Sequence, residues 1–392
     1  MIHLIYKQFK LTFLMKTCMI VYSYYPFDVR VRKEAEALTR HKIEVDVICL
    51  KKKGEKTYET INGVNVHRLN FETKRGSKLR YLYQYTIFNI ISFFKLNSLD
   101  RKRKYDTIHI HSLPDWLVFI AFIQKMKGKR IILDLHESLP EIFLARFNSK
   151  PLAKLLEFIE NISANYADQV ITVSETLKKL FVQRGVRNNI TVIMNVPDED
   201  LSAIKFARPA NLKNRFVINY SGGLNKERGL DVAIKAINEI KDDIPSVYLM
   251  IFGSGSEDKN LKELVKELKL ENYVFFGGQI SNKEVMKYTK IADIGTIPWY
   301  SNPITEVGMP NKLFESIALE KPIICGNTKA IHDLMGDSIL FFEPGNYRDM
   351  AKQLLFAYQN KNKLKAMITS ASKIYKNINW NIMEKRLYNL YK

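Results

Sequence analysis

The feature that most constrains the fold of this chain is an alternation of short apolar runs with helical runs, which occurs twice along the sequence. Apolar runs bounded by turn residues predict buried strands, and apolar residues at helical spacing between them predict amphipathic helices. Strands that alternate with helices are typical of a parallel, doubly wound α/β sheet. In the N-terminal half the pattern predicts strands at Cys18–Tyr22, Val45–Leu50, Thr107–His111, Arg130–Leu135, Val170–Val173 and Thr191–Met194, and helices at Val29–Thr39, Leu117–Met126 and Leu152–Ala167.

The alternation restarts after residues 197–215, a polar segment with two prolines that is predicted to be a linker. A chain of 392 residues suits two domains of about 100–200 residues each. We therefore expect an extension at 1–14, one domain at 15–200 and a second at 201–375. The second domain is predicted to have strands at Phe216–Tyr220, Tyr248–Phe252, Val274–Phe276, Ile294–Thr296 and Pro322–Cys325, and helices at Gly229–Ile240, Lys259–Leu268, Ser281–Ile291 and Lys312–Leu319.

An excess of basic residues gives the chain a formal net charge of +20. Such a charge favours an anionic partner, which could be nucleic acid, anionic lipid or a phosphorylated substrate, and a compositional bias of the genome explains it equally well. The charge is dispersed and shows no helix-turn-helix, RRM or zinc-finger spacing, so nucleic acid is not an expected partner. Cys18, Cys49 and Cys325 form no CxxC pair, which predicts no disulfide or zinc site and favours a reducing cytosol.

The segment Leu79–Leu96 is rich in Tyr and Phe, and basic clusters flank it. Aromatic residues between cations are typical of a helix in a membrane interface, and a buried helix of the first domain is the alternative. No run reaches the roughly 18–20 apolar residues that a membrane-spanning helix needs. We therefore expect a cytoplasmic protein, peripheral at the inner face of the cytoplasmic membrane, with the anionic membrane surface as a partner.

Glycine-rich turns follow two predicted strands of the second half. Gly222 and Gly223 end the first strand, before a short loop with Lys226 and Arg228, and Gly253 ends the second. Glycine lets backbone approach a ligand, a helix N-terminus favours phosphate, and arginine offers a planar fork for phosphate oxygens. Neither turn matches the GxGxxG fingerprint or a Walker A sequence, so ATP hydrolysis of that type is not expected. An ordinary turn is the alternative to a phosphate site.

The sequence MPNKLFESIALEKPII places Pro310 and Asn311 at a predicted helix start. Lys312 precedes Glu315 by three residues and Asn311 precedes it by four, so all three share one helix face. A carboxylate there can accept two hydrogen bonds from a ribose diol, and the helix N-terminus can face a diphosphate. The alternative is that Glu315 is a solvated first-turn acid.

Polar residues also cluster where a strand of the first half ends, since RIILDLHESLPEIF places Asp134, His136 and Glu137 there. Ligands of parallel sheets bind beyond the carboxyl ends of strands, so these side chains are candidates for a cleft between the two domains. His109 and His111 lie on one face of the preceding strand because side chains alternate with period two. No further ligand spacing supports a metal pair, and no metal is expected.

These stretches, in this order, resemble the retaining glycosyltransferases of family 4, and the resemblance covers nearly the whole chain from Met15. It is carried by PFDVRVRKEAEAL and ILDLHESLPE in the first half, and by YSGGLNKERGLDVAIKA, IFGSGSE and MPNKLFESIALEKPII in the second. The resemblance implies the GT-B fold, in which two facing Rossmann-like, doubly wound parallel-sheet domains enclose the ligand cleft. INWNIMEKRLYNLY is similar to the family's last helix, so residues 376–392 are expected to cross back to the first domain.

The resemblance also implies roles for single residues. The expected catalytic residues are His136 against the donor sugar, Arg228 at the diphosphate and Glu315 at the ribose. The expected acceptor-side residues are Asp28, Arg30, Asp134 and Glu137. The other expected donor contacts are Gly222, Gly223, Lys226, Gly253, Ile280, Asn311, Lys312 and Leu313, with Ile280 near the base through its backbone.

Three positions depart from the family's usual pattern. Gly223 stands where many members have an arginine, and Lys226 is expected to replace that charge. Val307 stands eight residues before Glu315, where an acid is usual, as in a branch of the family that reads PxKLFE. The two-glycine acceptor loop of other members is replaced by Tyr24–Val31, which is why Asp28 and Arg30 are candidates.

The expected function is transfer of a sugar from a nucleoside diphosphate sugar to a lipid-linked or polysaccharide acceptor, with retention of configuration, in cell-surface polysaccharide biosynthesis. No cofactor and no metal are expected, because cations of the chain would stabilise the leaving diphosphate. A sugar-nucleotide epimerase and a non-catalytic partner subunit with the same fold are the alternatives.

Overall fold

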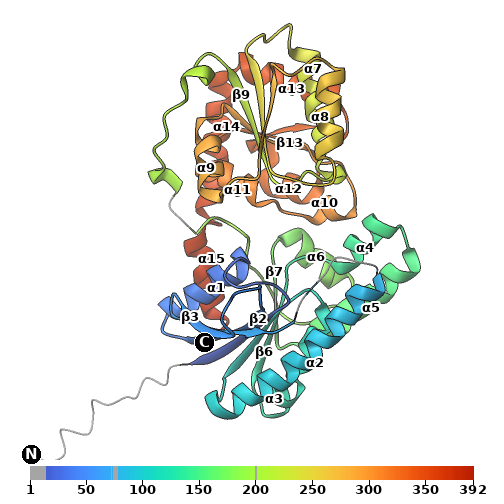
Figure 1. The fold of residues 1–392 in the computed structure, drawn as a ribbon, viewed down its shortest axis with the longest axis vertical. Helices are drawn as coiled ribbons and strands as arrows, with labels where there is room; N and C mark the ends of the chain where they lie inside the picture. Colours follow the sequence, from blue (N-terminus) through green and yellow to red (C-terminus); the bar gives the residue numbers. More distant parts are fainter. Residues whose placement is uncertain (1–14, 72, 74–77, 199–200) are drawn as a thin grey trace, which may run out of the picture.

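A computed structural model describes residues 15–71, 73, 78–198 and 201–392, so the expected extension at 1–14 lies outside the described residues. The chain forms two α/β domains, each built on one sheet (Figure 1). This confirms the predicted fold class. Among the described residues, no helix combines the length and the apolar character that crossing a bilayer requires.

The N-terminal domain contains an eight-stranded sheet in the order β3-β4-β2-β1-β5-β6-β7-β8, and only the edge strand β3 is antiparallel to its neighbour. Its strands are β1 (Lys16–Val21), β2 (Glu44–Leu50), β3 (Tyr58–Ile61), β4 (Val64–Leu69), β5 (Thr107–His111), β6 (Arg130–Leu135), β7 (Gln169–Thr172) and β8 (Ile190–Val192). Its helices are α1 (Val29–Arg40), α2 (Lys78–Arg103), α3 (Phe122–Met126), α4 (Leu139–Phe147), α5 (Lys150–Tyr166) and α6 (Glu175–Gln183), with a 3₁₀ turn η1 (Asp115–Ala121).

The C-terminal domain contains a six-stranded parallel sheet in the order β11-β10-β9-β12-β13-β14. Its strands are β9 (Phe216–Ser221), β10 (Val247–Phe252), β11 (Val274–Gly278), β12 (Ile294–Ile297), β13 (Ile323–Gly326) and β14 (Leu340–Phe342). The remaining helices are α7 (Leu230–Ile240), α8 (Asp258–Glu267), α9 (Asn282–Ile291), α10 (Pro303–Val307), α11 (Asn311–Ala318), α12 (Lys329–Met335), α13 (Tyr347–Gln359), α14 (Lys361–Lys376) and α15 (Trp380–Asn389), with 3₁₀ turns at Leu201–Ala203, Ala210–Leu212, Lys226–Arg228 and Gly336–Ser338.

The strand order in each sheet reverses at one point, between β1 and β5 in the first sheet and between β9 and β12 in the second. At such a point the connection after one strand goes to one side of the sheet and the connection after its neighbour goes to the other side. This opens a crevice beyond the carboxyl ends of the two strands. Because the two domains face each other, these crevices belong to one interdomain space. The fold thus places the ligand site at the domain boundary.

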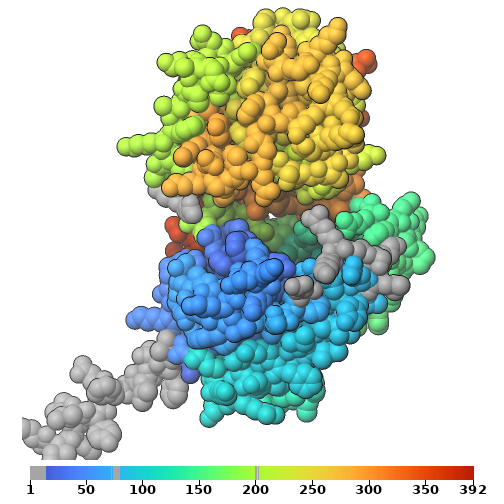
Figure 2. All heavy atoms as spheres, viewed as in Figure 1, coloured from blue at the N-terminus to red at the C-terminus, as the bar shows by residue number. Residues whose placement is uncertain are grey.

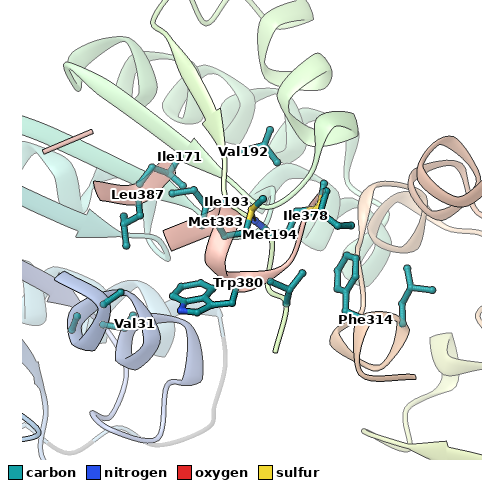
Figure 3. Close-up of a cluster of buried hydrophobic side chains, with 14 of the residues drawn as sticks. Val31, Ile171, Val192, Ile193, Met194, Phe314, Ile378, Trp380, Met383 and Leu387 are labelled. Carbon is teal, nitrogen blue, oxygen red and sulfur yellow. Dashed lines mark hydrogen bonds between the residues drawn. The ribbon is translucent and has the colours of Figure 1, made fainter. Parts of the chain in front are cut away.

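A hydrophobic cluster joins the two domains on one side of this boundary (Figure 3). Trp380, Met383 and Leu387 of α15 pack with Val31 of α1 and with strands of the first sheet. Polar contacts fix the same helix, since Arg130 donates to the Leu390 carbonyl at 2.6 Å. The last helix of the chain therefore packs on the N-terminal domain, while the chain between it and β14 covers the second sheet.

Two local predictions differ from the structure. The single helix expected at Leu117–Met126 is wrong, because residues 115–121 form a 3₁₀ turn and only Phe122–Met126 is α-helical. Leu117, Val118, Ile120 and Ala121 are all buried, so packing on more than one side overrides the helical spacing. The hairpin of β3 and β4 was not predicted, and it replaces a crossover at the edge of the sheet.

Candidate active site

A cavity of about 750 Å³ lies between the two domains, at the carboxyl ends of both sheets. Figure 2 shows the hollow between the domains. Ten of the expected site residues line the cavity together: His136, Glu137, Gly222, Gly223, Arg228, Gly253, Ile280, Asn311, Lys312 and Glu315. The space is therefore shared by strand ends of the first domain and by glycine turns and a helix start of the second.

The glycine turns form the floor of the cavity by packing backbone against backbone. Gly253 has φ +139°, and a Cβ atom on it would lie 1.9 Å from the Gly222 carbonyl oxygen. The Gly222 N–H donates to the Phe252 carbonyl at 2.9 Å, which holds the two turns together. Glycine at these positions is thus required by close approach of the loops, and the same approach leaves main-chain atoms at the cavity wall.

Arg228 closes the 3₁₀ turn Lys226–Arg228 and reaches into the cavity. Its guanidinium lies 4.7 Å from the centre of the Trp299 ring, and its side chain is 30% exposed. A cation over an indole face is held in place without losing its charge. Arg228 therefore presents a fixed, partly exposed positive charge to whatever occupies the cavity.

Lys312 supplies a second nitrogen beside the first glycine turn. A Cβ atom on Gly222 would lie 2.9 Å from Lys312 Nζ, and that nitrogen lies 3.6 Å from the centre of the Tyr220 ring. Burial, and next the Arg228 charge, lower the pKa of Lys312 to about 7. An amine in this setting gains a proton readily when an anion arrives, because the anion favours the charged form.

Glu315 lies on the same helix face, one turn after Asn311 and three residues after Lys312. Burial raises the pKa of its carboxyl, while Lys312 and Lys33 of α1 act in the opposite direction. The N-terminal end of α11 has no side-chain cap, and its first two residues, Asn311 and Lys312, line the cavity. This helix start therefore offers an acceptor carboxylate beside two cations.

Leu313 does not take part in this surface. Its side chain is fully buried in the hydrophobic cluster that joins the domains, and its N–H donates to the Pro310 carbonyl at 3.1 Å. The side chain of Leu313 faces the core because every third or fourth residue of this amphipathic helix does so. The expected contact of Leu313 with the donor stays a prediction for its backbone.

His136 is held at the cavity wall by a buried polar network. Its Nε2 lies 3.0 Å from Asp134 Oδ2 and 3.2 Å from His111 Nδ1. Burial alone would lower the pKa of His136, but the neighbouring Asp134 carboxylate raises it above its ordinary value. The ring orientation of His136 is therefore set by Asp134, which acts from below the cavity surface.

Arg30 forms a bidentate pair with Asp134, with Nε and Nη2 each 2.8 Å from a carboxylate oxygen. Its remaining nitrogen, Nη1, donates to the Ile193 carbonyl at 2.8 Å and to Asn195 Oδ1 at 2.9 Å. Burial would raise the pKa of Asp134, but Arg30 and His136 hold it well below its usual range. This pair is buried, so neither side chain reaches an acceptor directly.

Of the four expected acceptor-side residues, three do not line the cavity. Arg30 and Asp134 support His136 from the interior, and Asp28 caps α1 by accepting from the Val31 N–H at 3.2 Å. Only Glu137 lines the cavity. Asp28 and Arg30 lie at the start of α1, where the first side chain caps the helix and the second is buried, and Asp134 lies near the end of β6 with its side chain buried.

A second group of buried residues surrounds the same ion pair. Ligand atoms of Glu34, His109, His111 and Asp134 all lie within 4.8 Å of one another. The Arg30 guanidinium already occupies the position of a counter-ion there, since its Nη2 lies 3.2 Å from Glu34 Oε1 in addition to its contacts with Asp134. Burial raises the pKa of Glu34 to about 8, which reduces the charge that remains to be neutralised.

Lys226 does not line the interdomain cavity. It borders a separate cavity of about 390 Å³ with Asn225, Asp231 and Glu257. The 3₁₀ turn points Lys226 and Arg228 in different directions, so Lys226 does not replace the arginine that is expected at Gly223. Lys312 Nζ, adjacent to Gly222, is the second nitrogen near this turn.

Several lining residues were missed by the sequence analysis. They include Asn195, Ser138, Gln279, Ser254, Met309 and Trp299. Trp299 could have been found, because it follows the carboxyl end of a predicted strand in the run TIPWY. The same signal marks Asn195, which directly follows the predicted strand Thr191–Met194.

Two family models match consecutive parts of the chain. Residues 28–201 match the model described as Glycosyltransferase Family 4, and residues 202–374 match the model described as Glycosyl transferases group 1. An uncharacterized glycosyltransferase from Haemophilus influenzae is 26% identical over 75% of this chain and 74% of its own length. The two matches meet at residue 202, in the segment that connects the two sheets.

Another relative is the capsular polysaccharide biosynthesis glycosyltransferase CapM of Staphylococcus aureus, 25% identical over 51% of this chain and 54% of its own length. Among solved structures, the Anabaena protein HepE in complex with UDP-glucose superposes with a TM-score of 0.72, at 17% identity, over 96% of this chain and 99% of that chain. Such a match shows the fold, and the family models show the activity class. The chain is a glycosyltransferase of the GT-B type and resembles family 4 in both of its domains.

Proposed function

We propose that this enzyme transfers a sugar from a nucleoside diphosphate sugar to a glycan acceptor, with retention of configuration at the sugar. The observation that carries the proposal is that Arg228, Lys312 and Glu315 converge in one interdomain cavity. Two cations beside glycine turns suit a diphosphate, and a carboxylate one helical turn away suits a ribose diol. The relative with UDP-glucose bound supports a uridine nucleotide as donor.

In the proposed reaction the bond between the anomeric carbon and the diphosphate oxygen breaks, and its electron pair goes to the leaving diphosphate. The acceptor hydroxyl forms the new bond on the face that the diphosphate leaves, and a phosphate oxygen takes the hydroxyl proton. Negative charge grows on the diphosphate while positive charge grows on the sugar ring. Arg228, Lys312 and the start of α11 stabilise the first of these charges, so the proposal needs neither a metal ion nor another cofactor.

His136 has a positioning role toward the donor sugar in this proposal. Asp134 and Arg30 orient its ring, and Glu137 and Glu141 lie on the same side of the cavity. The acceptor would enter from this N-terminal side. A relative that acts in capsular polysaccharide biosynthesis supports a cell-surface glycan or its lipid-linked precursor as acceptor.

Donor affinity is expected to fall as the pH rises, because of Lys312. In the free enzyme the pKa of Lys312 is lowered to about 7, and a bound diphosphate raises it. Between these two values the complex holds a proton that the free enzyme lacks, so UDP affinity falls by up to about tenfold per pH unit. Titration calorimetry between pH 7.5 and about 9, above the range near 6 where a terminal phosphate titrates, measures this fall.

The matched control is Lys312→Arg, whose charge persists over this whole range. We expect it to bind UDP with little pH dependence and to take up almost no proton in buffers of different ionisation enthalpy. An affinity of the wild-type enzyme that is constant above pH 7.5 would contradict the role given to Lys312.

Product analysis tests the proposed function as a whole. The enzyme is incubated with UDP-glucose, or with the corresponding GDP, ADP or CMP sugar, in the presence of extracted lipid-linked oligosaccharides as acceptors. The products are separated and analysed by NMR. We expect release of nucleotide with a new glycosidic bond of the donor's anomeric configuration. An altered sugar nucleotide without transfer would instead indicate an epimerase, and an unchanged donor would indicate a non-catalytic subunit.

A further inference from the structure

Helix α2 of the N-terminal domain exposes large apolar side chains on the side that faces away from the core. Its buried stripe, spaced by four residues, consists of Gln84, Phe88, Ser92, Leu96 and Asp100, of which three are polar. Its opposite stripe contains Leu82, Ile90 and Phe94, which are 53%, 48% and 66% exposed. A helix that only covered a sheet would show the reverse distribution.

Helix α5 has the same property. Leu155, Phe158 and Ile162 recur on one exposed stripe, and Phe158 is 62% exposed. The opposite stripe carries two buried polar residues, Glu160 and Ser163. Two neighbouring helices with outward-facing aromatic and aliphatic side chains exceed the scattered single apolar residues that are normal on a protein surface.

The two helices belong to one layer. Both contact η1, which lies between them on the side of the sheet that carries Phe88, Leu117 and Ala164. The short helix α3 extends this layer, since Phe122 stacks on Phe93 of α2 with ring centres 5.7 Å apart, and Met126 at its end is 83% exposed.

Basic residues border these apolar side chains. Arg101 and Lys102 are exposed at one end of α2, and Lys150 and Lys154 are exposed on α5. The one acidic residue in the sequence of α2, Asp100, is buried, and Glu157 of α5 is paired with Arg184 at 3.2 Å. Within the described part of the chain, this face therefore combines exposed apolar groups with exposed positive charge, and binding to an anionic bilayer uses both.

We propose that α2, α3 and α5 form a membrane-binding face, with Leu82, Ile90, Phe94, Met126, Leu155 and Phe158 inserted among the headgroups of anionic lipids. We name these six residues the outer helical face. For Leu79–Leu96 the sequence left open a helix in a membrane interface and a buried helix of the first domain. In the proposal both apply, since one side of the helix packs on the domain and the other contacts lipid.

The location of this face suits an enzyme with a lipid-linked acceptor. In a parallel α/β sheet a helix runs antiparallel to the strand that follows it, so α2 and α5 begin at the carboxyl edge, where the cavity lies. Helix α4 packs on α5 and contributes Ile142 to the cavity wall. A bilayer along the outer helical face would thus bring lipid headgroups to the acceptor side of the cleft. The membrane contact itself does not depend on the donor chemistry proposed above.

Vesicle co-sedimentation tests the proposal with the full-length protein. The vesicles are pure phosphatidylcholine, and phosphatidylcholine with about 30% phosphatidylglycerol, a content chosen to give a negative surface potential. We expect the wild-type protein to bind the anionic vesicles at least about tenfold more strongly, with binding that weakens as salt rises. The triple variant Ile90→Ser/Phe94→Ser/Phe158→Ser is expected to lose at least about tenfold in partitioning, because each exposed apolar group adds to insertion.

The matched control is Phe275→Ser/Tyr358→Ser, which removes two exposed rings, 43% and 38% exposed, from the C-terminal domain. It should bind vesicles like the wild type. Stabilisation by UDP, measured on every variant, separates loss of membrane binding from loss of folding. Failure of the wild type to bind anionic vesicles would overturn the proposal, as would equal binding by the triple variant. A concentration-dependent dimer that the triple variant abolishes, without vesicle binding, would also overturn it, because the face would then pair with a second copy of the chain.

Discussion

Replacing Arg228 by alanine is expected to lower kcat/KM by about 10²–10³, because it removes a fixed charge from the site where negative charge develops. The guanidinium is held over Trp299, at 4.7 Å from the ring centre, so it needs little reorganisation when the diphosphate leaves. If its contact strengthens only in the transition state, kcat falls and KM changes little. Steady-state measurement of nucleotide release on wild type and variant gives both quantities.

Lys226→Ala is the control for this prediction. Lys226 belongs to the same 3₁₀ turn and carries the same charge, but it borders the separate cavity with Asn225 and Asp231. A substitution outside the site should leave kcat/KM within about twofold of the wild type. An Arg228→Ala enzyme with near-normal turnover would contradict the assignment, as would a loss of equal size in Lys226→Ala.

The second large effect is expected on stability, from the buried pair of Arg30 and Asp134. Removing one partner by Asp134→Leu or Arg30→Met leaves a charge buried without its partner, which typically costs about 3–5 kcal/mol in the free energy of unfolding. Asp134 is fully buried, and the carboxylate accepts two hydrogen bonds of 2.8 Å from Arg30. Urea denaturation, followed by far-UV circular dichroism, measures the loss.

The double variant Arg30→Met/Asp134→Leu separates the ion pair from ordinary packing. Because neither member of the Arg30–Asp134 pair is then left without the other, its loss should be smaller than the sum of the two single losses by about 0.5–3 kcal/mol. A double variant that accumulates as folded protein while a single variant does not would support the same conclusion. Strictly additive losses would mean that the two side chains act independently, which the bidentate geometry excludes.

Much of the fold follows from local sequence patterns. Strands such as β1, β10 and β13 are nearly continuous runs of buried apolar residues, as expected for strands buried on both faces, and the helices between the strands have amphipathic spacing. The hairpin of β3 and β4 was not predicted because the alternating pattern favours crossover connections, although Asn62-Gly63 between the two strands is a strong hairpin signal. Both residues have positive φ, 48° and 83°, as a tight hairpin turn requires.

The candidate site also has a part that local sequence predicts and a part that it does not. The glycine turns, Arg228 and the start of α11 follow strand ends directly, so a motif and its neighbours in sequence were enough to bring them together. The side chains of Lys226 and Leu313 lie away from the interdomain cavity, because the geometry of the turn and the periodicity of the helix decide which way each points. The support of His136 by Arg30 depends on a contact across 104 residues, which no local pattern encodes.

The most direct test of the central claim, that the interdomain cavity binds a nucleotide, is a thermal-shift panel of UDP, GDP, ADP and CMP on the wild type, on Glu315→Ala and on Glu239→Ala. Glu239 is an exposed glutamate of α7 in the same domain and serves as the control. Ligand at about 100 times its dissociation constant stabilises the fold by roughly 2.7 kcal/mol, a clearly measurable shift. The proposed function predicts stabilisation by one nucleotide, UDP, that is lost in Glu315→Ala and kept in Glu239→Ala. No response of the wild type to any nucleotide, or an equal response in Glu315→Ala, would contradict it.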